Sequence, residues 1–277
     1  MTLPTIHQYA VIGNPVEHSL SPFIHTAFGA QTKQPIEYIR LFSELGKFNE
    51  TLETFIRSGA LGANITVPFK MEAFQRCDHL SERARIAGAV NTLSFQQQNE
   101  QLFITGDNTD GIGLVRDIKD NQKQAISQKN ILILGAGGAV RGVIFPLLAC
   151  KPEQIVIANR TAEKAQQLAS TFAAYGPITG CGFDQVPECA FDIVINGTSA
   201  SLSGAIPEIN PEIVQSAFCY DMAYAKEPTA FLQWATQANA RVTVDGLGML
   251  VEQAAEAFFI WEGVFPNTQS VIGELRD

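Results

Sequence analysis

The chain has 277 residues, of which 46% are apolar, so it can form one large domain or two modest domains with a substantial core. Its formal net charge of −9 argues against nucleic-acid or anionic-membrane binding. No apolar run is long enough to span a bilayer, and the N-terminus lacks a basic start followed by an apolar signal core. We therefore expect a cytoplasmic globular protein.

The five cysteines and four histidines show no metal-ligand spacing, so no metal site is expected. Reduced, mostly buried thiols are predicted. His18 precedes a candidate site, where a surface or supporting role is favoured over catalysis.

Strand-like and helix-like runs alternate along the whole chain, which is typical of α/β architecture. A helix is predicted over Ser43–Arg57 because its apolar residues fall on one face, and another is predicted to begin near Gly111. Gln96–Gln101 is polar and predicts a hairpin tip or loop. The strands predicted in this first part are Tyr9–Gly13, Ile36–Phe42, Ala63–Val67 and Val90–Phe95.

Two hydroxyls lie two residues apart in Ser19-Leu20-Ser21-Pro22. Pro22 favours extended geometry at Ser21, and in an extended segment both hydroxyls point the same way. Such a pair suits a polyhydroxylated or carboxylated ligand. On this motif alone, a turn and helix start at Ser-Pro is the favoured interpretation.

The segment Asn64–Lys70 joins a predicted strand to a lysine. Asn64 and Thr66 are expected on one face of the strand, with Ile65 and Val67 facing the core. A lysine at the start of a helix is unfavourable beside the helix dipole, which suggests a demand other than folding for Lys70. A simple surface cation is the alternative.

An acidic turn, Gly106–Gly111, contains Asp107. It lacks the full calcium-loop pattern, and a plain turn with an Asx cap is the alternative to a site. Asn91 either points into the same cleft or caps a strand. Gln253 lies beside the apolar stripe of a predicted helix over Leu247–Glu262 and faces either solvent or the cleft.

The most informative stretch is Gly135–Ala139, which lies between an apolar β-branched run and a helical run. Strand, glycine turn and helix is the geometry that places a pyrophosphate on backbone N–H groups at a helix N-terminus. Further strands of this part are predicted at Ile131–Leu134, Ile155–Ala158, Ile193–Asn196 and Cys219–Met222.

The strand after the glycines ends in Asn159-Arg160-Thr161, with Lys164 one turn later. Enzymes that prefer NAD usually carry an acid at this strand end. A 2′-phosphate is attracted by a guanidinium and repelled by a carboxylate, so the pattern favours NADP(H). The alternative is that Arg160 is a solvated charge and Thr161 an ordinary helix N-cap.

Taken in order, these motifs resemble the shikimate dehydrogenase family nearly from end to end. The resemblance is carried by Gly13-Asn14-Pro15, Ser19–Pro22, Asn64–Lys70, Gly88–Thr92, Gly106–Gly111, Gly135–Ala139, Asn159–Thr161, Tyr220–Tyr224 and Gly248–Ala255. It implies two α/β domains: an N-terminal substrate domain, and a Rossmann-like, doubly wound NADP-binding domain. The first would span residues 1–108, completed by about 247–277 with the C-terminal helix returning to it, and the second residues 109–246.

The resemblance also implies NADPH-dependent reduction of 3-dehydroshikimate to shikimate, in aromatic amino-acid (chorismate) biosynthesis. Lys70 and Asp107 would be the catalytic pair, with their division of the proton transfer left open. The implied substrate residues are Ser19, Ser21, Asn64, Thr66, Asn91, Tyr224 and Gln253. The implied NADP residues are Gly135, Ala136, Gly137, Gly138, Ala139, Asn159, Arg160, Thr161, Lys164, Met222 and Gly246, with Glu82 beside them.

Two alternatives stay open at this point. One is a relative that also oxidises quinate or uses NAD, and the other is a non-catalytic NADP-binding regulator. A monomer and a homodimer are both compatible with the sequence.

Overall fold

Two six-stranded sheets organise the chain in the computed structural model, which describes residues 6–99, 101–198 and 204–277. The chain divides into two units. Unit 1 comprises Met1–Gly113, Val251–Leu275 and Asp277, and unit 2 comprises Leu114–Leu250 and Arg276. The domain boundaries predicted from the sequence lie between residues 108 and 109 and between 246 and 247. In the structure, the chain passes from one unit to the other between residues 113 and 114 and between 250 and 251.

Unit 1 is a mixed sheet in the order β2-β1-β3-β5-β6-β4, in which β5 runs antiparallel to both β3 and β6. Its strands are β1 His7–Gly13, β2 Ile36–Phe42, β3 Gly62–Ile65, β4 His79–Leu80, β5 Thr92–Gln98 and β6 Gln101–Asp107. Its helices are α1 Ser21–Thr32, α2 Phe48–Arg57, α3 Lys70–Gln75, α4 Glu82–Ala87 and α10 Thr268–Arg276, with parts of α5 Asp110–Arg116 and α9 Leu247–Glu262.

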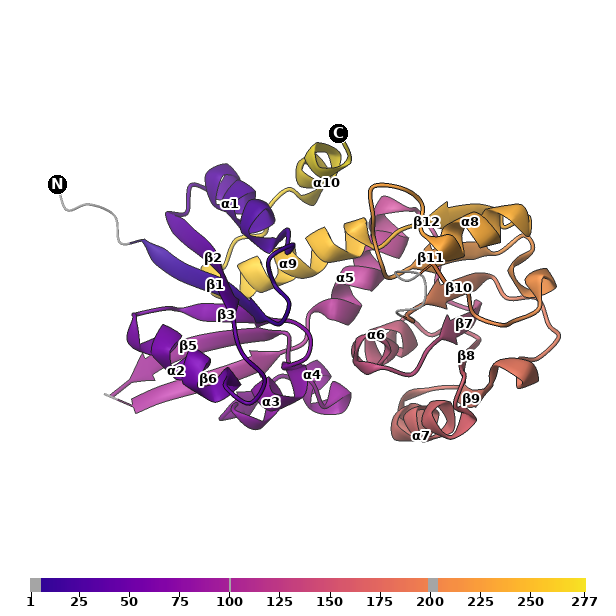
Figure 1. The fold of residues 1–277 in the computed structure, drawn as a ribbon, viewed down its shortest axis with the longest axis horizontal. Coiled ribbons are helices and arrows are strands. Elements are labelled where there is room, and N and C mark those ends of the chain that lie inside the picture. Colours follow the sequence, from indigo (N-terminus) through magenta and orange to yellow (C-terminus); the bar gives the residue numbers. More distant parts are fainter. Residues whose placement is uncertain (1–5, 100, 199–203) are drawn as a thin grey trace. The chain divides into compact units, whose positions relative to one another are not determined.

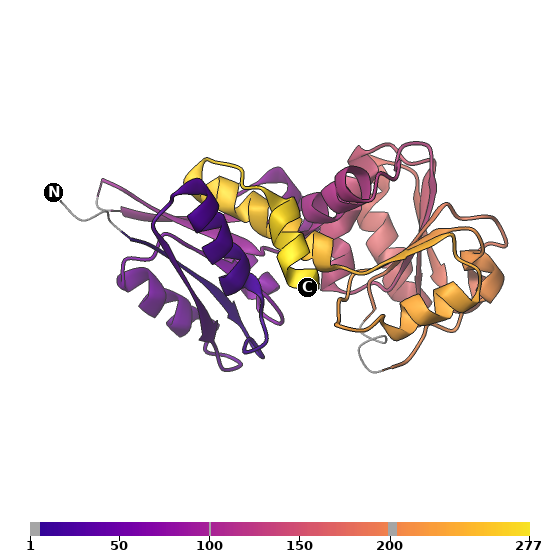
Figure 2. The same ribbon diagram turned by 90° about the horizontal axis from the view of Figure 1, so that it is seen from above.

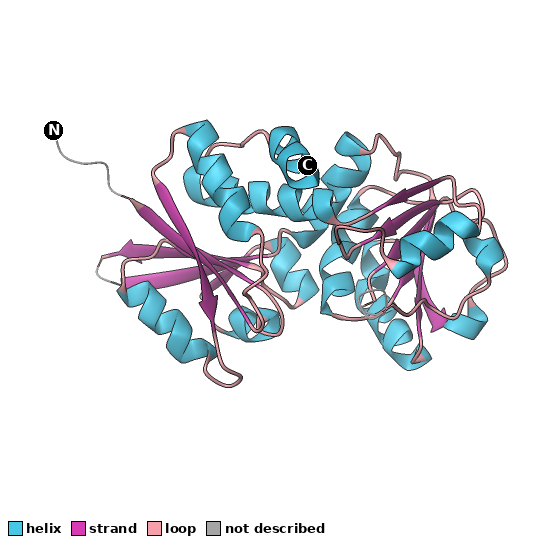
Figure 3. Cartoon of the chain, turned by 45° about the horizontal axis from the view of Figure 1, so that its top comes forward, coloured by secondary structure: helices cyan, strands magenta, loops and turns pink. Residues whose placement is uncertain are grey.

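Helices cover both faces of this first sheet (Figures 1 and 3). On one face, α2, α3 and α4 pack through Leu52, Ala73 and Ala84 against strand residues such as Ile12 and Leu93. On the other face, α1 and α9 lie next to one another (Figure 2) and join through an edge contact of Phe28 with Phe258. The alternation of side chains along the strands supplies apolar groups to both layers.

Unit 2 is an entirely parallel sheet in the order β12-β11-β10-β7-β8-β9. Its strands are β7 Asn130–Leu134, β8 Gln154–Asn159, β9 Ile178–Gly182, β10 Ile193–Asn196, β11 Phe218–Asp221 and β12 Val242–Val244. Its helices include α6 Gly138–Ala149, α7 Ala162–Phe172 and α8 Ala230–Gln237. Counted from β7, this order is the doubly wound Rossmann order, which confirms the predicted fold class.

Several predicted elements differ from the structure in their bounds. The helix expected over Ser43–Arg57 begins at Phe48. The buried Ser43 residue hydrogen-bonds through its hydroxyl to that of Thr51, and the chain between Ser43 and Phe48 forms a turn instead of helix. The tip predicted over Gln96–Gln101 is shorter in the structure, because β5 continues to Gln98 and pairs as a hairpin with β6, which begins at Gln101. β6 also includes Gly106 and Asp107, which were predicted to lie in a turn.

The expectation of mostly buried thiols is wrong. Cys219 is buried, whereas Cys77, Cys150 and Cys181 are partly exposed and Cys189 is exposed. All five are free thiols. Among the described residues, no helix is both long enough and apolar enough to cross a membrane.

The aromatic layer beneath α1 contains a fully buried histidine. His25 stacks on Tyr38, with ring centroids 4.3 Å apart and planes 6° apart. Among the described residues, neither ring nitrogen has a hydrogen-bond partner. Burial lowers the pKa of His25 to about 3, and the nearby Asn64 opposes this shift without a hydrogen bond of normal geometry. His25 is therefore neutral in the folded protein.

This buried imidazole predicts a loss of stability in acid. In the unfolded chain, His25 has a pKa of about 6.5 and binds a proton below that pH. In the folded chain, His25 does not bind this proton until about pH 3. The free energy of unfolding should therefore fall by about 1.4 kcal/mol per pH unit in that window. We expect His25→Phe to lose less stability than the wild type between about pH 6 and pH 4 in urea melts at several pH values. Parallel pH dependences in the two proteins would contradict the assignment.

Candidate active site

The centre of the polar cluster in unit 1 is an ion pair between Lys70 and Asp110. Lys70 is the first residue of α3 and Asp110 the first residue of α5. Lys70 Nζ lies 2.5 Å from Asp110 Oδ2, and the two side chains are 20% and 10% exposed. A cation and a carboxylate this close and this poorly solvated interact strongly.

Asp107 does not pair with Lys70, so the pairing expected from the sequence is wrong. Its carboxylate accepts two parallel hydrogen bonds from Arg83, at 2.7 and 2.9 Å, and a third from the Ser81 hydroxyl at 2.5 Å. Asp107 ends β6, whereas Asp110 lies on the next helix, and the turn between them points the two carboxylates at different cations. Asp110 was not among the predicted site residues; its signal in the sequence is a second carboxylate three residues after Asp107.

Asn91 connects the ion pair to the rest of the cluster. Its amide nitrogen donates to Asp110 Oδ1 at 2.8 Å and to Thr109 Oγ1 at 2.9 Å, and its oxygen accepts from the backbone N–H of Thr109. Gln253, from α9, lies with its side-chain oxygen 3.3 Å from Thr109 Oγ1. The structure therefore brings Asn91 and Gln253 to the turn that presents Asp110.

Asn64 belongs to the same network, at the end of β3. Its oxygen accepts a 2.7 Å hydrogen bond from the buried Tyr38 hydroxyl, and its nitrogen donates to the Asn91 carbonyl and to Thr92. Three bonds fix which way this amide faces. Tyr38 was not among the predicted site residues. It alternates on β2 with exposed residues, a pattern that indicates only an ordinary core aromatic.

The strand face expected for Thr66 and Val67 is wrong, because β3 ends at Ile65. The chain then turns, with the Phe69 N–H bonded to the Thr66 carbonyl. Val67 is 66% exposed, and Phe69 fills the core instead. Thr66 packs its methyl group against Gly13, where a side chain would collide with it.

Ser19 and Ser21 lie together, although not in the extended segment that was expected. Ser21 is the first residue of α1, so the backbone follows the interpretation in which a helix starts at Ser-Pro. The two hydroxyl oxygens nevertheless lie 3.2 Å apart, and Arg40 binds the Ser19 carbonyl with two donors. The two hydroxyls are adjacent because the turn folds Ser19 over the start of the helix, where the Ser19 hydroxyl donates to Ser21.

In unit 2, the glycine turn lines a cavity of about 680 Å³ at the carboxyl ends of β7, β8 and β10. The lining includes Gly135, Ala136, Gly137, Gly138, Ala139, Asn159, Arg160, Phe183, Gly197, Thr198 and Ala205–Glu208. The structure thus brings together seven of the residues predicted to bind NADP. Gly135 has φ +104° and lies against Gly197, so a side chain there would be strained.

Gly137 and Gly138 leave room for a ligand. Among the residues that the structure describes, a Cβ atom at either position would meet nothing within 4 Å, so none of these residues covers the backbone at the start of α6. This cradle fits a pyrophosphate that must approach backbone N–H groups closely. Thr161 precedes α7 without a side-chain capping bond, and Arg160 and Lys164 are exposed. These side chains are free to meet the ribose end of a dinucleotide.

Met222 and Gly246 lie in contact beside this cavity. A Cβ on Gly246 would collide with the Met222 backbone, and the Met222 sulfur lies against Gly197 of the cavity wall. The buried Asp221 carboxylate orients the loop that carries Met222 and Tyr224, because it accepts hydrogen bonds from Asn196, Thr229 and the Ala223 N–H. Tyr224 is half-buried, and burial raises the pKa of its phenol.

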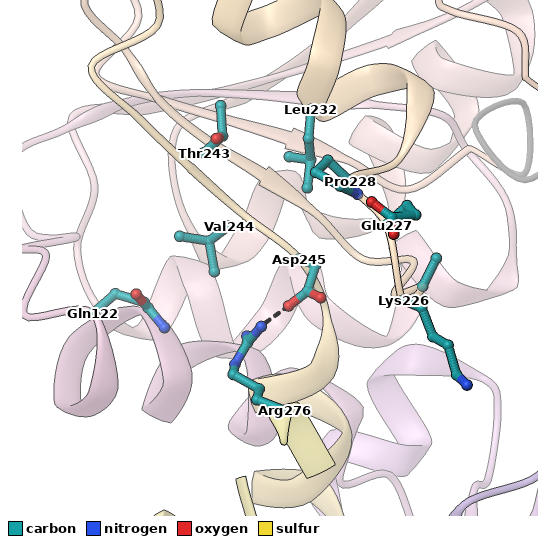
Figure 4. Close-up of a pocket in the computed structure, with 10 residues that line it drawn as sticks. Gln122, Lys226, Glu227, Pro228, Leu232, Thr243, Val244, Asp245 and Arg276 are labelled. Atoms are coloured by element: carbon teal, nitrogen blue, oxygen red, sulfur yellow. Dashed lines mark hydrogen bonds and ion pairs between the residues drawn. The ribbon is translucent and has the colours of Figure 1, made fainter. Parts of the chain in front are cut away.

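A second cavity of unit 2, of about 410 Å³, adjoins the same two loops (Figure 4). An ion pair between Arg276 and Asp245, 2.8 Å apart, spans part of it. Asp245 directly precedes Gly246, so this ion pair helps to fix the backbone that contacts Met222.

Glu82, the remaining residue predicted beside NADP, is an exposed residue at the start of α4 in unit 1.

Comparison with known proteins gives consistent matches over most of the chain. Three family models match: the shikimate dehydrogenase substrate binding domain over residues 11–93, shikimate / quinate 5-dehydrogenase over 117–219, and the shikimate 5′-dehydrogenase C-terminal domain over 246–276. A shikimate dehydrogenase (NADP(+)) from Hydrogenovibrio crunogenus is 52% identical over 272 residues, with 97% of each chain covered.

Solved structures also match the chain over almost its whole length. An Ael1 enzyme from Pseudomonas putida is 41% identical with a TM-score of 0.91, and 98% of each chain is covered. Shikimate 5-dehydrogenase from Thermus thermophilus, solved in complex with NADP(H) and shikimate, is 29% identical with a TM-score of 0.85 and the same coverage. With these matches, and with the glycine cradle and the buried amide network in place, the chain belongs to the shikimate dehydrogenase family.

Proposed function

We propose that the protein is an NADP-dependent shikimate dehydrogenase, which reduces 3-dehydroshikimate to shikimate reversibly within chorismate and aromatic amino-acid biosynthesis. The observation that carries the proposal is the Lys70–Asp110 ion pair set among amide and hydroxyl side chains. Those neutral groups suit a ring with several hydroxyls, and the ion pair suits a proton-transfer step.

The residues of the unit 2 cavity fit NADP. The backbone of Gly137 and Gly138 is open to the pyrophosphate, and Arg160, without an acid beside it, fits the 2′-phosphate. Asn159 donates to the Thr161 carbonyl at 2.9 Å and shapes the loop that carries Arg160. Bound NADPH supplies the hydride for the reduction.

In reduction, the carbonyl oxygen gains negative charge and then a proton as the ketone becomes an alcohol. The Lys70 ammonium is the group of the cluster that can donate this proton and stabilise the developing charge. Asp110 would hold the ammonium in one orientation and balance its charge, and Asn91 holds Asp110. In the reverse direction, the neutral amine of Lys70 accepts the proton of the alcohol.

We assign binding of the ring in unit 1 to six residues: Ser19, Ser21, Asn64, Thr66, Asn91 and Gln253. The role of Tyr224, in unit 2, stays a prediction from the resemblance. Within unit 1, the three amides are held in fixed orientations by the network described above. The hydroxyl pair of Ser19 and Ser21 offers two donors to a carboxylate.

Ser19→Ala and Ser21→Ala should each cost about 0.5–3 kcal/mol in kcat/KM. The carboxylate lies across the ring from the reacting carbon, so the loss should appear mostly in KM. Because both serines would bind one group, their effects should be non-additive in a double-mutant cycle. A substrate analogue with a neutral amide in place of the carboxylate is the matched control. Serine variants that distinguish acid from amide as well as the wild type does would show that the carboxylate binds elsewhere.

The test of the function is a rate measurement by absorbance of NADPH, with shikimate and quinate each offered together with NADP⁺ and NAD⁺. We expect the highest kcat/KM for shikimate with NADP⁺. A higher value with NAD⁺ or quinate would favour the broader relative, and no turnover with any pair would favour the non-catalytic regulator. Light scattering of the purified protein distinguishes the monomer from the homodimer, both of which are compatible with the sequence.

A further inference from the structure

Arg83 forms an ion pair with Asp107, the residue that precedes the turn leading to Asp110. Arg83 lies on α4, and its guanidinium binds Asp107 at both oxygens, 2.7 and 2.9 Å away. The same guanidinium contacts Glu256 of α9 at 2.8 Å. Burial acts against the charged guanidinium, but Asp107 and Glu256 outweigh it and raise the pKa of Arg83. Arg83 is therefore a permanent positive charge in a partly buried position.

The backbone geometry brings Asp107 close to Lys70. The Lys70 carbonyl accepts a hydrogen bond from the Val90 N–H, and the Asp107 carbonyl accepts one from the next N–H, that of Asn91. Both residues are thus bonded to the same dipeptide. The two side chains therefore start from neighbouring points of the backbone, and charges in poorly solvated surroundings are weakly screened. A free Asp107 carboxylate would compete with Asp110 for the Lys70 ammonium.

Arg83 also connects the two segments that complete the cluster. Asp107 begins the turn that presents Asp110, and its carboxylate accepts the Asn108 N–H at 2.6 Å, which fixes the start of that turn. Glu256 lies three residues after Gln253 on α9, so both face the same side of the helix. One guanidinium therefore fixes both the acidic turn and the helix that carries Gln253.

We infer that Arg83 is a positioning residue for the reaction, and that it acts mainly by neutralising Asp107, so that Lys70 pairs with Asp110 alone. This inference rests on the proposed function. On this inference Arg83 controls the charge of Asp107 rather than the shape of the turn. If Arg83 acts through charge, neutralising Asp107 as well should restore kcat. If Arg83 only holds the turn in shape, the double variant should stay as slow as the Arg83 variant.

The experiment compares Arg83→Gln, Asp107→Asn and the double variant with the wild type, by kcat and KM for shikimate and NADP⁺. We expect Arg83→Gln to lower kcat about tenfold or more, with KM for NADP⁺ changed less than about twofold. In the double variant the Asp107 carboxylate that would compete for Lys70 is gone, so kcat should return to within about threefold of Asp107→Asn. Arg85→Gln, an exposed arginine of the same helix, is the matched control and should keep wild-type kcat.

A double variant as slow as Arg83→Gln, or an Arg83→Gln variant with wild-type kcat, would overturn the inference. If Arg83→Gln does not fold, the thermal melt of the double variant decides. Recovery of folding and kcat in the double supports a charge effect, and failure of both to fold shows a structural clamp and overturns it. Absence of wild-type turnover would instead reject the proposed function, so the two failures are distinguishable.

Discussion

Lys70→Ala is expected to lower kcat by roughly 10²–10⁴-fold, the contribution typical of a positioned acid or base, with a much smaller change in KM. The physical reason is that the alkoxide formed from the ketone needs a proton and a positive charge at one place. Lys70 is positioned there by the start of α3 and held by Asp110. Steady-state rates in both directions, with circular dichroism to verify the fold, measure the effect. Turnover above about a tenth of wild type would remove Lys70 from the mechanism.

The two aspartates of the acidic turn provide a matched comparison for this prediction. Asp110→Asn removes the carboxylate on Lys70 and should lower kcat about a hundredfold or more. Asp107→Asn leaves that ion pair in place and should cost less than about tenfold. The reverse order of losses would restore the Lys70–Asp107 pair expected from the sequence and contradict the assignment to Asp110.

Arg160→Ala should weaken NADPH binding by about 1.5–3 kcal/mol, the range for hydrogen bonds to charged groups. Arg160 lines the cavity that contains the glycine turn, at the end of a strand without an acid. NADH lacks the 2′-phosphate, so its binding should hardly change. Dissociation constants for the two nucleotides, measured by fluorescence titration, test this.

A control for general charge effects is Lys151→Ala, an exposed cation before the start of β8, whereas Arg160 follows the end of that strand. It should leave both dissociation constants unchanged. Equal losses for NADPH and NADH in Arg160→Ala would show that Arg160 does not distinguish the two nucleotides.

The order of motifs along the chain determined most of the architecture. Apolar β-branched runs predicted β7, β8 and β10 within a residue or so of their observed bounds, because parallel strands buried on both faces are continuous apolar segments. The helix Leu247–Glu262 was predicted with its observed bounds, since its apolar stripe persists through four turns. Strands such as β4 and β12, short and without such a pattern, had no comparable signal.

The sequence by itself also placed Lys70 at the start of a helix and the glycines at the start of α6, because turns and helix starts are local in the chain. Only the tertiary structure decided which aspartate belongs to Lys70. Asp107 and Asp110 are three residues apart and chemically identical, and their partners, Arg83 and Lys70, come from separate helices. The choice depends on where the sheet places α3 and α4 against one turn, and no local pattern of residues encodes that long-range geometry.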